Sequence, residues 1–298
     1  MVENPLMPYG SVAAEATGSR GLALIINNYE FTGPEKLKER VCGLQDGEKL
    51  TKTFRKLGYR ICLEENRNAD EIISIFRNLL PPNSTATASH SIDSRVHKDD
   101  DSFVCCVVSH GYWDKDRRQD FVYASDEKSF SVQQLALDYL SVPPGANRQN
   151  LLKQKPKLFF IHACRGTDIT SVSADDNESC GHPLPMLPQV TLFPISADFL
   201  FSYPVVPGTK AFRDDHSGTF FISILCQMID EFAKKLDVEL ILKRVHYELT
   251  SQESTAYNYK NVAGETVRVR HCPQLISTLR GPFFLTKEAA ERYNEHLK

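Results

Sequence analysis

Several features that would place a chain in a specialised class are missing from this sequence. Among its 298 residues, no apolar stretch approaches the roughly 18 residues of a membrane-spanning helix, and the start MVENPLMPYG lacks the basic and apolar regions of a secretory signal. Charge of one sign is not in excess, because 35 lysine and arginine residues face 38 aspartate and glutamate residues. The formal charge of -3 gives no field that would hold the protein on nucleic acid or on an anionic membrane. We therefore expect neither as a partner.

Metal-binding and phosphate-binding motifs are also missing. The eight cysteines include no C-x-x-C pair, and Cys180 with His182 has no second ligand pair, so the spacing predicts no metal site. Without a G-x-G-x-x-G or phosphate loop, a small-molecule-binding α/β domain is a weak alternative, and we expect no cofactor. Cys105 and Cys106 lie in the apolar run FVCCVV, and a chain of this length needs no disulfide staples. These patterns favour reduced thiols and a reducing compartment, the cytoplasm or the nucleus.

The first half of the chain alternates short apolar runs with amphipathic stretches. The runs are residues 22–26, 59–63, 103–108 and 157–161. They are nearly continuous rather than alternating, as in strands that are covered on both faces. Apolar residues recur at helical spacing between them. This order predicts right-handed crossovers and an α/β fold, with a mostly parallel central sheet and helices on both faces.

The second half continues the pattern with less regular spacing. We expect strands at 197–203 and 281–285 and helices near 218–235 and 238–249. Two stretches read as loops because they are rich in polar residues or proline, namely 81–101 and 166–189. Loops of this length inside a compact domain are usually functional, disordered or processed.

Two reactive side chains follow two of the predicted strands. His110 comes directly after FVCCVVS, and Cys164 comes three residues after KLFFI in the loop HACRG. Because ligands bind at the carboxyl ends of parallel strands, both side chains should face one rim of the sheet. There a cysteine could act as a nucleophile while the imidazole manages the proton. With eight cysteines and nine histidines in the chain, the pairing alone could also arise by chance.

Longer strings around these two residues resemble the caspase family. FFIHACRG, with SHG before it, is similar to the caspase signature. LALIINNYEF, ERVCGLQDGEKLTKTFRKLGY, DSFVCCVVSHG and ADFLFSYPVVPGTKAFRDDHSGTFF are similar to caspase segments and occur in the family's order. The resemblance covers residues 20 to 287 and implies a caspase-like sandwich with the layers predicted above.

The resemblance implies roles for the residues at the rim. Cys164 matches the nucleophile and His110 the general acid and base. The backbone N–H groups of Gly111 and Cys164 match the oxyanion hole, where the absent Cβ of a glycine lets the substrate approach the backbone.

The resemblance also implies a substrate pocket. Arg40 and Arg213 match the two arginines that grip the substrate aspartate, and guanidinium groups hold a carboxylate bidentately. His162 stands where the family usually has glutamine, so we expect substrate binding to improve as the pH falls through its titration. Lys210 replaces an apolar or aromatic wall and is expected to favour polar or acidic substrate residues. Phe212, in the same segment, is assigned to substrate binding as well.

Members of the caspase family are zymogens that are cut after aspartate between a large and a small subunit, and the resemblance implies such a cut here. By that comparison, residues 1–20 form a short N-terminal segment, 21–176 a large subunit and 177–298 a small subunit, with 166–194 as the intersubunit linker. Asp168, Asp175 and Asp176 lie in the interval where such a cut is expected, the alternative being an uncut surface loop.

The resemblance also implies an activity and a partner. The run GPFFL at 281–285 matches the edge strand through which caspases pair, so we expect a homodimer of large and small subunit pairs, or a heterodimer with another caspase. The expected activity is that of a cysteine endopeptidase cutting protein substrates after aspartate, in apoptosis or related regulatory proteolysis. The alternative, motivated by His162 and Lys210, is a weak or inactive homologue that binds and regulates an active caspase.

Overall fold

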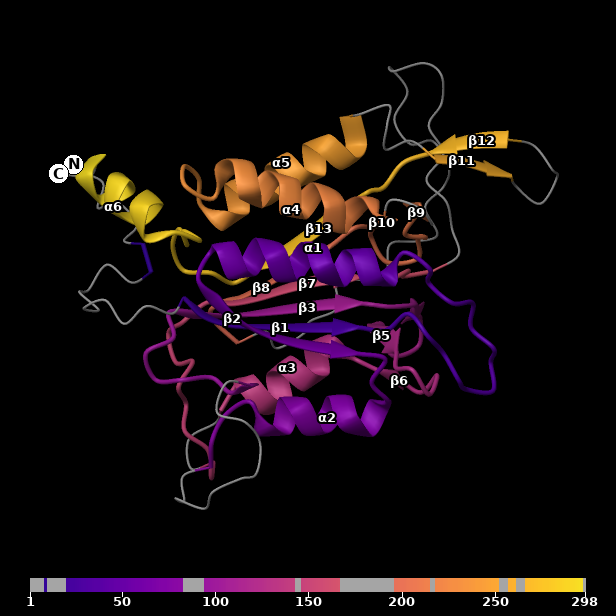
Figure 1. Ribbon diagram of the computed structural model, residues 1–298, viewed down its shortest axis with the longest axis horizontal. Coiled ribbons are helices and arrows are strands. Elements are labelled where there is room, and N and C mark those ends of the chain that lie inside the picture. Colours follow the sequence, from indigo (N-terminus) through magenta and orange to yellow (C-terminus); the bar gives the residue numbers. More distant parts are fainter. Residues whose placement is uncertain are drawn as a thin grey trace.

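A six-stranded sheet forms the centre of the molecule (Figure 1). The computed structural model describes residues 8–9, 20–82, 94–142, 146–166, 196–214, 218–251, 257–260 and 266–296. The strands of the sheet are β1 (Gly21–Asn27), β2 (Tyr59–Glu65), β3 (Ser102–Val108), β7 (Lys157–His162), β8 (Phe199–Tyr203) and β13 (Gln274–Ser277). They lie in the order β13-β8-β7-β3-β1-β2. Neighbouring strands are parallel, except that β13 runs antiparallel to β8.

Helices cover both faces of this sheet (Figure 1). One face carries α1 (Gly43–Lys56), α4 (Phe220–Phe232) and α5 (Val238–Ser251), and the other carries α2 (Ala69–Asn78) and α3 (Val132–Leu140). Helix α6 (Lys287–His296) follows near the end of the chain. The fold is therefore α/β with a mostly parallel sheet between two helical layers, which confirms the prediction. No helix in the described ranges has the length and apolarity needed to cross a membrane.

Smaller sheets lie beyond the central one. A three-stranded sheet consists of β4 (Gly111–Asp114), β5 (Gln119–Tyr123) and β6 (Ser129–Phe130), and two hairpins pair β9 (Arg213–Asp214) with β10 (Gly218–Thr219) and β11 (Tyr257–Lys260) with β12 (Thr266–Val269). Figure 1 shows β5, β6, β9 and β10 toward the carboxyl ends of the parallel strands. They therefore surround the rim at which the sequence places the reactive side chains.

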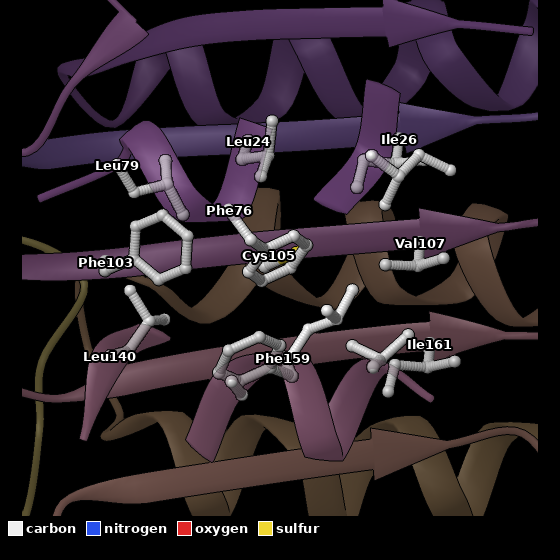
Figure 2. Close-up of a cluster of buried hydrophobic side chains, with 14 of the residues drawn as sticks. Leu24, Ile26, Phe76, Leu79, Phe103, Cys105, Val107, Leu140, Phe159 and Ile161 are labelled. Carbon is white, nitrogen blue, oxygen red and sulfur yellow. The ribbon is translucent and has the colours of Figure 1, made fainter. Parts of the chain in front are cut away.

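The central strands are apolar because both of their sides are covered. Every residue of β1, β3 and β7 is buried, which explains the continuous apolar runs. In β3, Phe103 and Cys105 belong to the core beneath α2 and α3 (Figure 2), whereas Val104 and Cys106 belong to the core beneath α1, α4 and α5. Both cysteines are free thiols whose pKa is raised by burial. The other cysteines in the described ranges are also free.

The register of two strands decides where the reactive residues leave the sheet. Val108 of β3 pairs with His162 of β7, the last residue of each strand. The pairing continues for one more residue, because Ser109 N donates to His162 O at 3.1 Å. The segments that carry His110 and Cys164 therefore leave the sheet beside one another.

The prediction of an edge strand at 281–285 is wrong. This run is not a strand, and the strand at the β8 edge of the sheet is β13. Phe283 and Leu285 are buried instead, Phe283 O accepts from Val238 N at the start of α5 at 2.8 Å, and the Phe283 ring meets Tyr9 edge-on. The run is apolar because it is packed under a helix and not because it pairs in a sheet.

Candidate active site

Gly111 brings the histidine segment against the cysteine. A Cβ built at Gly111 would lie 2.7 Å from Phe121 O, 2.8 Å from Ala163 Cβ and 3.0 Å from Cys164 O. Only glycine permits so close an approach. The backbone of residue 111 is thereby seated against the loop that carries Cys164, as the resemblance implies. The partly exposed Cys164 donates its thiol hydrogen to Ala211 O, with a sulfur–oxygen distance of 3.6 Å.

The ring of His110 is held in one tautomer. Its Nε2 lies 2.6 Å from Lys38 O, and its ring contacts Phe31 with a centroid separation of 5.0 Å. Because a carbonyl oxygen only accepts, Nε2 carries the hydrogen and Nδ1 is left as the basic nitrogen. Burial lowers the pKa of His110 to about 4, with a further contribution from the positive charges of Arg213 and Arg40, while the Lys38 carbonyl and Glu127 oppose the shift. The imidazole is therefore neutral at physiological pH, the protonation state that a general base requires, although the lowered pKa makes it a weaker base than a solvent-exposed histidine.

Arg40 is a buried cation near His110, whose pKa it lowers. Its side chain is 1% exposed, and it donates to Asn28 O at 3.2 Å and to Asp46 Oδ2 at 3.3 Å. Asp46 also accepts from the backbone N–H and the hydroxyl of Thr219, at 2.9 and 3.2 Å. Burial lowers the pKa of Arg40 and raises that of Asp46, and each side chain opposes the other's shift by its charge. The positive charge of Arg213 also lowers the pKa of Arg40, so the two guanidinium groups lie close enough to interact.

His162 is buried among these cations and is neutral. It is 3% exposed, and its ring stacks on Phe221 with a centroid separation of 6.3 Å. Its Nδ1 is buried and has no hydrogen-bond partner among the described residues. Burial lowers its pKa well below the usual range, and the charges of Arg40, His271, Arg213 and His110 act in the same direction. The titration expected for this histidine is thereby moved well below neutral pH.

His271 has no motif around it and was missed from the sequence. It is 2% exposed, and its Nε2 accepts from Phe212 N at 3.0 Å. Its ring meets the rings of Phe212 and Phe220 edge-on, at 5.7 and 6.1 Å. His271 thus fixes Phe212, which is buried, next to Arg213. Lys210 lies part-exposed in the same segment.

The loop after Cys164 is fastened by a buried ion pair. Arg165 Nε and Nη2 donate to the two oxygens of Asp120 at 2.6 and 2.7 Å, and Nη1 donates to Val205 O at 2.9 Å and to Gln274 Oε1 at 2.5 Å. The guanidinium also lies over the Tyr203 ring, 4.1 Å from its centroid. One side chain thereby joins the cysteine loop to β5, β8 and β13. In the sequence, only the position of Arg165 directly after Cys164 indicated a role in supporting the site. Nothing in the sequence around Asp120 indicated its role.

The structure thus brings together Cys164, His110 and Gly111 on one side and Arg40, Arg213 and His162 on the other. Asp168, Asp175 and Asp176 lie outside the described residues. Within the described part of the chain, no group of three or more His, Cys, Asp and Glu side chains could hold a metal ion. A neutral imidazole, a thiol on the adjacent loop and two nearby guanidinium groups are the components that thiol catalysis on an anionic substrate requires.

Known proteins are similar to this chain in sequence. The family model for the caspase domain matches residues 20–284. Caspase-7 of Gallus gallus is 28% identical over 229 residues, covering 76% of this chain and 66% of that protein. Caspase-3 of Xenopus laevis is 28% identical over 267 residues, covering 90% and 80%. Caspase-8 of Mus musculus is 30% identical over 263 residues, covering 84% of this chain and 50% of that protein.

A solved structure agrees with the fold. The crystal structure of caspase-1 from Spodoptera frugiperda superposes with a TM-score of 0.69 and covers 91% of each chain. Because the two sequences are 23% identical, this likeness supports the fold alone.

Proposed function

The chain belongs to the caspase family of cysteine proteases, and from this premise we propose that it is an active endopeptidase that hydrolyses peptide bonds after aspartate. The observation that carries the proposal is the His110 ring, neutral and tied through Nε2 to Lys38 O, in the segment whose Gly111 is seated against Cys164.

The proposed reaction has two stages. Nδ1 of His110 takes the thiol proton of Cys164, and the thiolate sulfur attacks the peptide carbonyl carbon. The backbone N–H groups of Gly111 and Cys164 bind the developing oxyanion, an interaction worth about 3 to 4 kcal/mol per donor. The C–N bond breaks as His110 returns the proton to the leaving amine. Water, deprotonated by His110, then hydrolyses the thioester and frees the thiol.

Aspartate specificity follows from the charges of the pocket. Arg40 and Arg213 are two cations, and Asp46 neutralises part of this charge, so one net positive charge is available for one substrate carboxylate. Neutral His162 adds at most one hydrogen-bond donor to the substrate. A short carboxylate should therefore bind in preference to its neutral amide.

The test is turnover of fluorogenic tetrapeptides that end in aspartate, asparagine or glutamate. We expect cleavage of the aspartate peptide alone, abolished in Cys164→Ala and retained in Cys62→Ala, a part-buried thiol on β2 that serves as the matched control. No turnover from a correctly processed wild-type protein would refute the proposal. It would favour the alternative of a regulatory homologue, which His162 and Lys210 suggest and which adding the protein to an active caspase would test.

We further propose that the chain is processed in the linker 166–194, after Asp168, Asp175 or Asp176. A cut there is compatible with the fold, because β7 and β8 stay paired from Lys157 and Phe199 onward on either side of it. Intact mass before and after incubation should show two fragments for wild type and one chain for Cys164→Ala. An uncut wild-type chain with full activity would contradict this proposal.

We also propose a dimer of such subunit pairs, joined through β13, and a role in apoptosis or related proteolysis in the cytoplasm. Among the described strands of the central sheet, β13 and β2 lie at the edges, and β13 has β8 as its neighbour. An unpaired edge is a liability that a two-fold partner removes. Proline at Leu275 or Ile276 should yield monomers by light scattering if this edge forms the interface.

A further inference from the structure

A turn beside the proposed active site holds a residue in an unusual backbone conformation. Glu127 lies in the turn between β5 and β6, is 6% exposed and has a φ of 59°. This left-handed region is uncommon for a residue with a long side chain, and its strain persists only where the surrounding structure holds the residue in place. Hydrogen bonds to its carboxylate hold Glu127 in this conformation.

The carboxylate of Glu127 sits in a cradle of three successive backbone N–H groups. Oε2 accepts from Glu35 N at 2.5 Å and from Lys36 N at 3.1 Å, and Oε1 accepts from Leu37 N at 2.6 Å. Lys36 is itself left-handed, with a φ of 55°. Successive N–H groups around a left-handed residue form a concave anion site, so this segment is a backbone nest filled by a side chain of the same protein.

The nest lies directly before the carbonyl that holds the His110 ring. Lys38 follows Leu37, and its carbonyl oxygen is the acceptor 2.6 Å from His110 Nε2. The loop and the turn are also joined by Thr32 N, which donates to Ser125 O at 2.9 Å. The strand that precedes the turn also contacts the backbone of His110, because Tyr123 N at the end of β5 donates to His110 O at 2.9 Å.

We propose that Glu127 is a positioning residue for the general base: by occupying the backbone nest of residues 35–37, it fixes the Lys38 carbonyl and with it the tautomer and orientation of His110. The proposal rests on the proposed proteolysis only for its effect on rate. Its effect on the ring of His110 can be observed without turnover.

The charges around His110 give the direction of the pH effect. Arg213 and Arg40 lower the pKa of His110, and the Lys38 carbonyl and Glu127 raise it against the larger effect of burial. His162, the neighbouring titratable ring, is neutral. Removing the Glu127 carboxylate should therefore lower the pKa of His110 further and let the ring sample its other tautomer.

Glu127→Gly is the informative variant, because it removes the carboxylate and also relieves the left-handed strain. We expect kcat to fall about ten- to a hundred-fold, as for a base displaced by a fraction of an ångström, with KM changed by less than about two-fold. The melting temperature should fall as well, because three backbone N–H groups lose their acceptor, so kcat is measured well below the unfolding transition. Arg118→Gly, an exposed left-handed residue in the β4–β5 turn with a φ of 50°, is the matched control and should leave kcat unchanged.

Glu127→Gln covers the case in which Glu127→Gly does not fold, since it keeps the shape of the side chain and loses its charge. Its amide has one acceptor oxygen for three donors, so kcat should fall by a smaller factor than in the glycine variant. A fall in melting temperature with unchanged kcat in both variants would overturn the proposal, because it would show a purely structural role.

Imidazole nitrogen spectra in a Cys164→Ala background separate this proposal from the proposed protease function. Wild-type His110 should be the Nε2–H tautomer, and the Glu127 variants should show a mixture with a lower pKa. If wild type has no turnover but the tautomer changes, the protease assignment fails and the positioning role stands. If turnover is normal and the tautomer is the same in the Glu127 variants, the positioning role is refuted.

Discussion

Replacing Arg165 with methionine should remove much of the stability of the domain. The side chains of Arg165 and Asp120 are 4% and 9% exposed and form two hydrogen bonds of 2.6 and 2.7 Å. Methionine fills similar volume but leaves the Asp120 carboxylate buried without a counter-charge. Loss of one partner of a buried pair costs about 3 to 5 kcal/mol, a large part of the 5 to 15 kcal/mol of a typical folded protein.

The assay is urea unfolding of wild type, Arg165→Met, Asp120→Asn and the double variant. If the cost of Arg165→Met arises from an unpaired carboxylate, adding Asp120→Asn should recover a large part of it, giving a coupling free energy of about 2 kcal/mol or more. Arg165→Met should also lower activity, because the loop that carries Cys164 loses its attachment to β5 and β8.

The pH dependence supplies a second check on the same pair. Burial already raises the pKa of Asp120, and Arg165 opposes that rise. Without Arg165 the folded-state pKa must rise further above its unfolded value, so the variant loses stability relative to wild type as the pH increases. A single-variant cost below about 1 kcal/mol, or additive costs in the double variant, would refute the reasoning.

Three further predictions concern other buried titratable side chains. His162→Gln should leave the pH dependence of KM unchanged between about pH 6 and 8, because the pKa of His162 is well below that range; a KM that falls with pH only in wild type would contradict this. Burial lowers the pKa of Lys157 from 10.5 to about 8. The unfolding free energy of wild type should therefore rise by about 3 kcal/mol relative to that of Lys157→Met as the pH increases from about 8 to 10.5. Unfolding free energies, measured in urea, that change equally with pH in the two proteins would refute this prediction. Asp46→Asn leaves Arg40 buried without a counter-charge and should cost about 3 to 5 kcal/mol of folding free energy; because it also leaves more net positive charge beside the substrate carboxylate, KM for aspartate peptides should fall, and an unchanged KM would argue against Arg40 as a pocket residue.

The sequence predicted those parts of the site that depend on neighbouring residues in the chain. His110 and Cys164 each follow an apolar run closely, and parallel strands that pair in register bring such positions together. Arg40 and Arg213 were identified through motif resemblance; the structure shows that their charges act on each other and on His162, and the substrate pocket itself stays a prediction.

The errors and omissions have a common physical cause. A short apolar run is compatible with a strand or with a buried loop, and periodicity does not distinguish them, so 281–285 was misread. Asp120 and His271 were missed because their partners, Arg165 and Phe212, are remote in the chain. Asp46 lies near its partner Arg40 in the chain, but its contact with Thr219 is remote.

By itself, the sequence determined the layers of the fold and the chemistry available at its rim, because hydrophobic periodicity and the residues that end each strand are local properties. Only the tertiary structure decided the state of that chemistry. The neutrality of His110 and His162 depends on burial and on cations from other segments, and the His110 tautomer depends on one carbonyl of a loop that Glu127 holds. Burial and through-space charge are set by packing between distant segments, which no local pattern records.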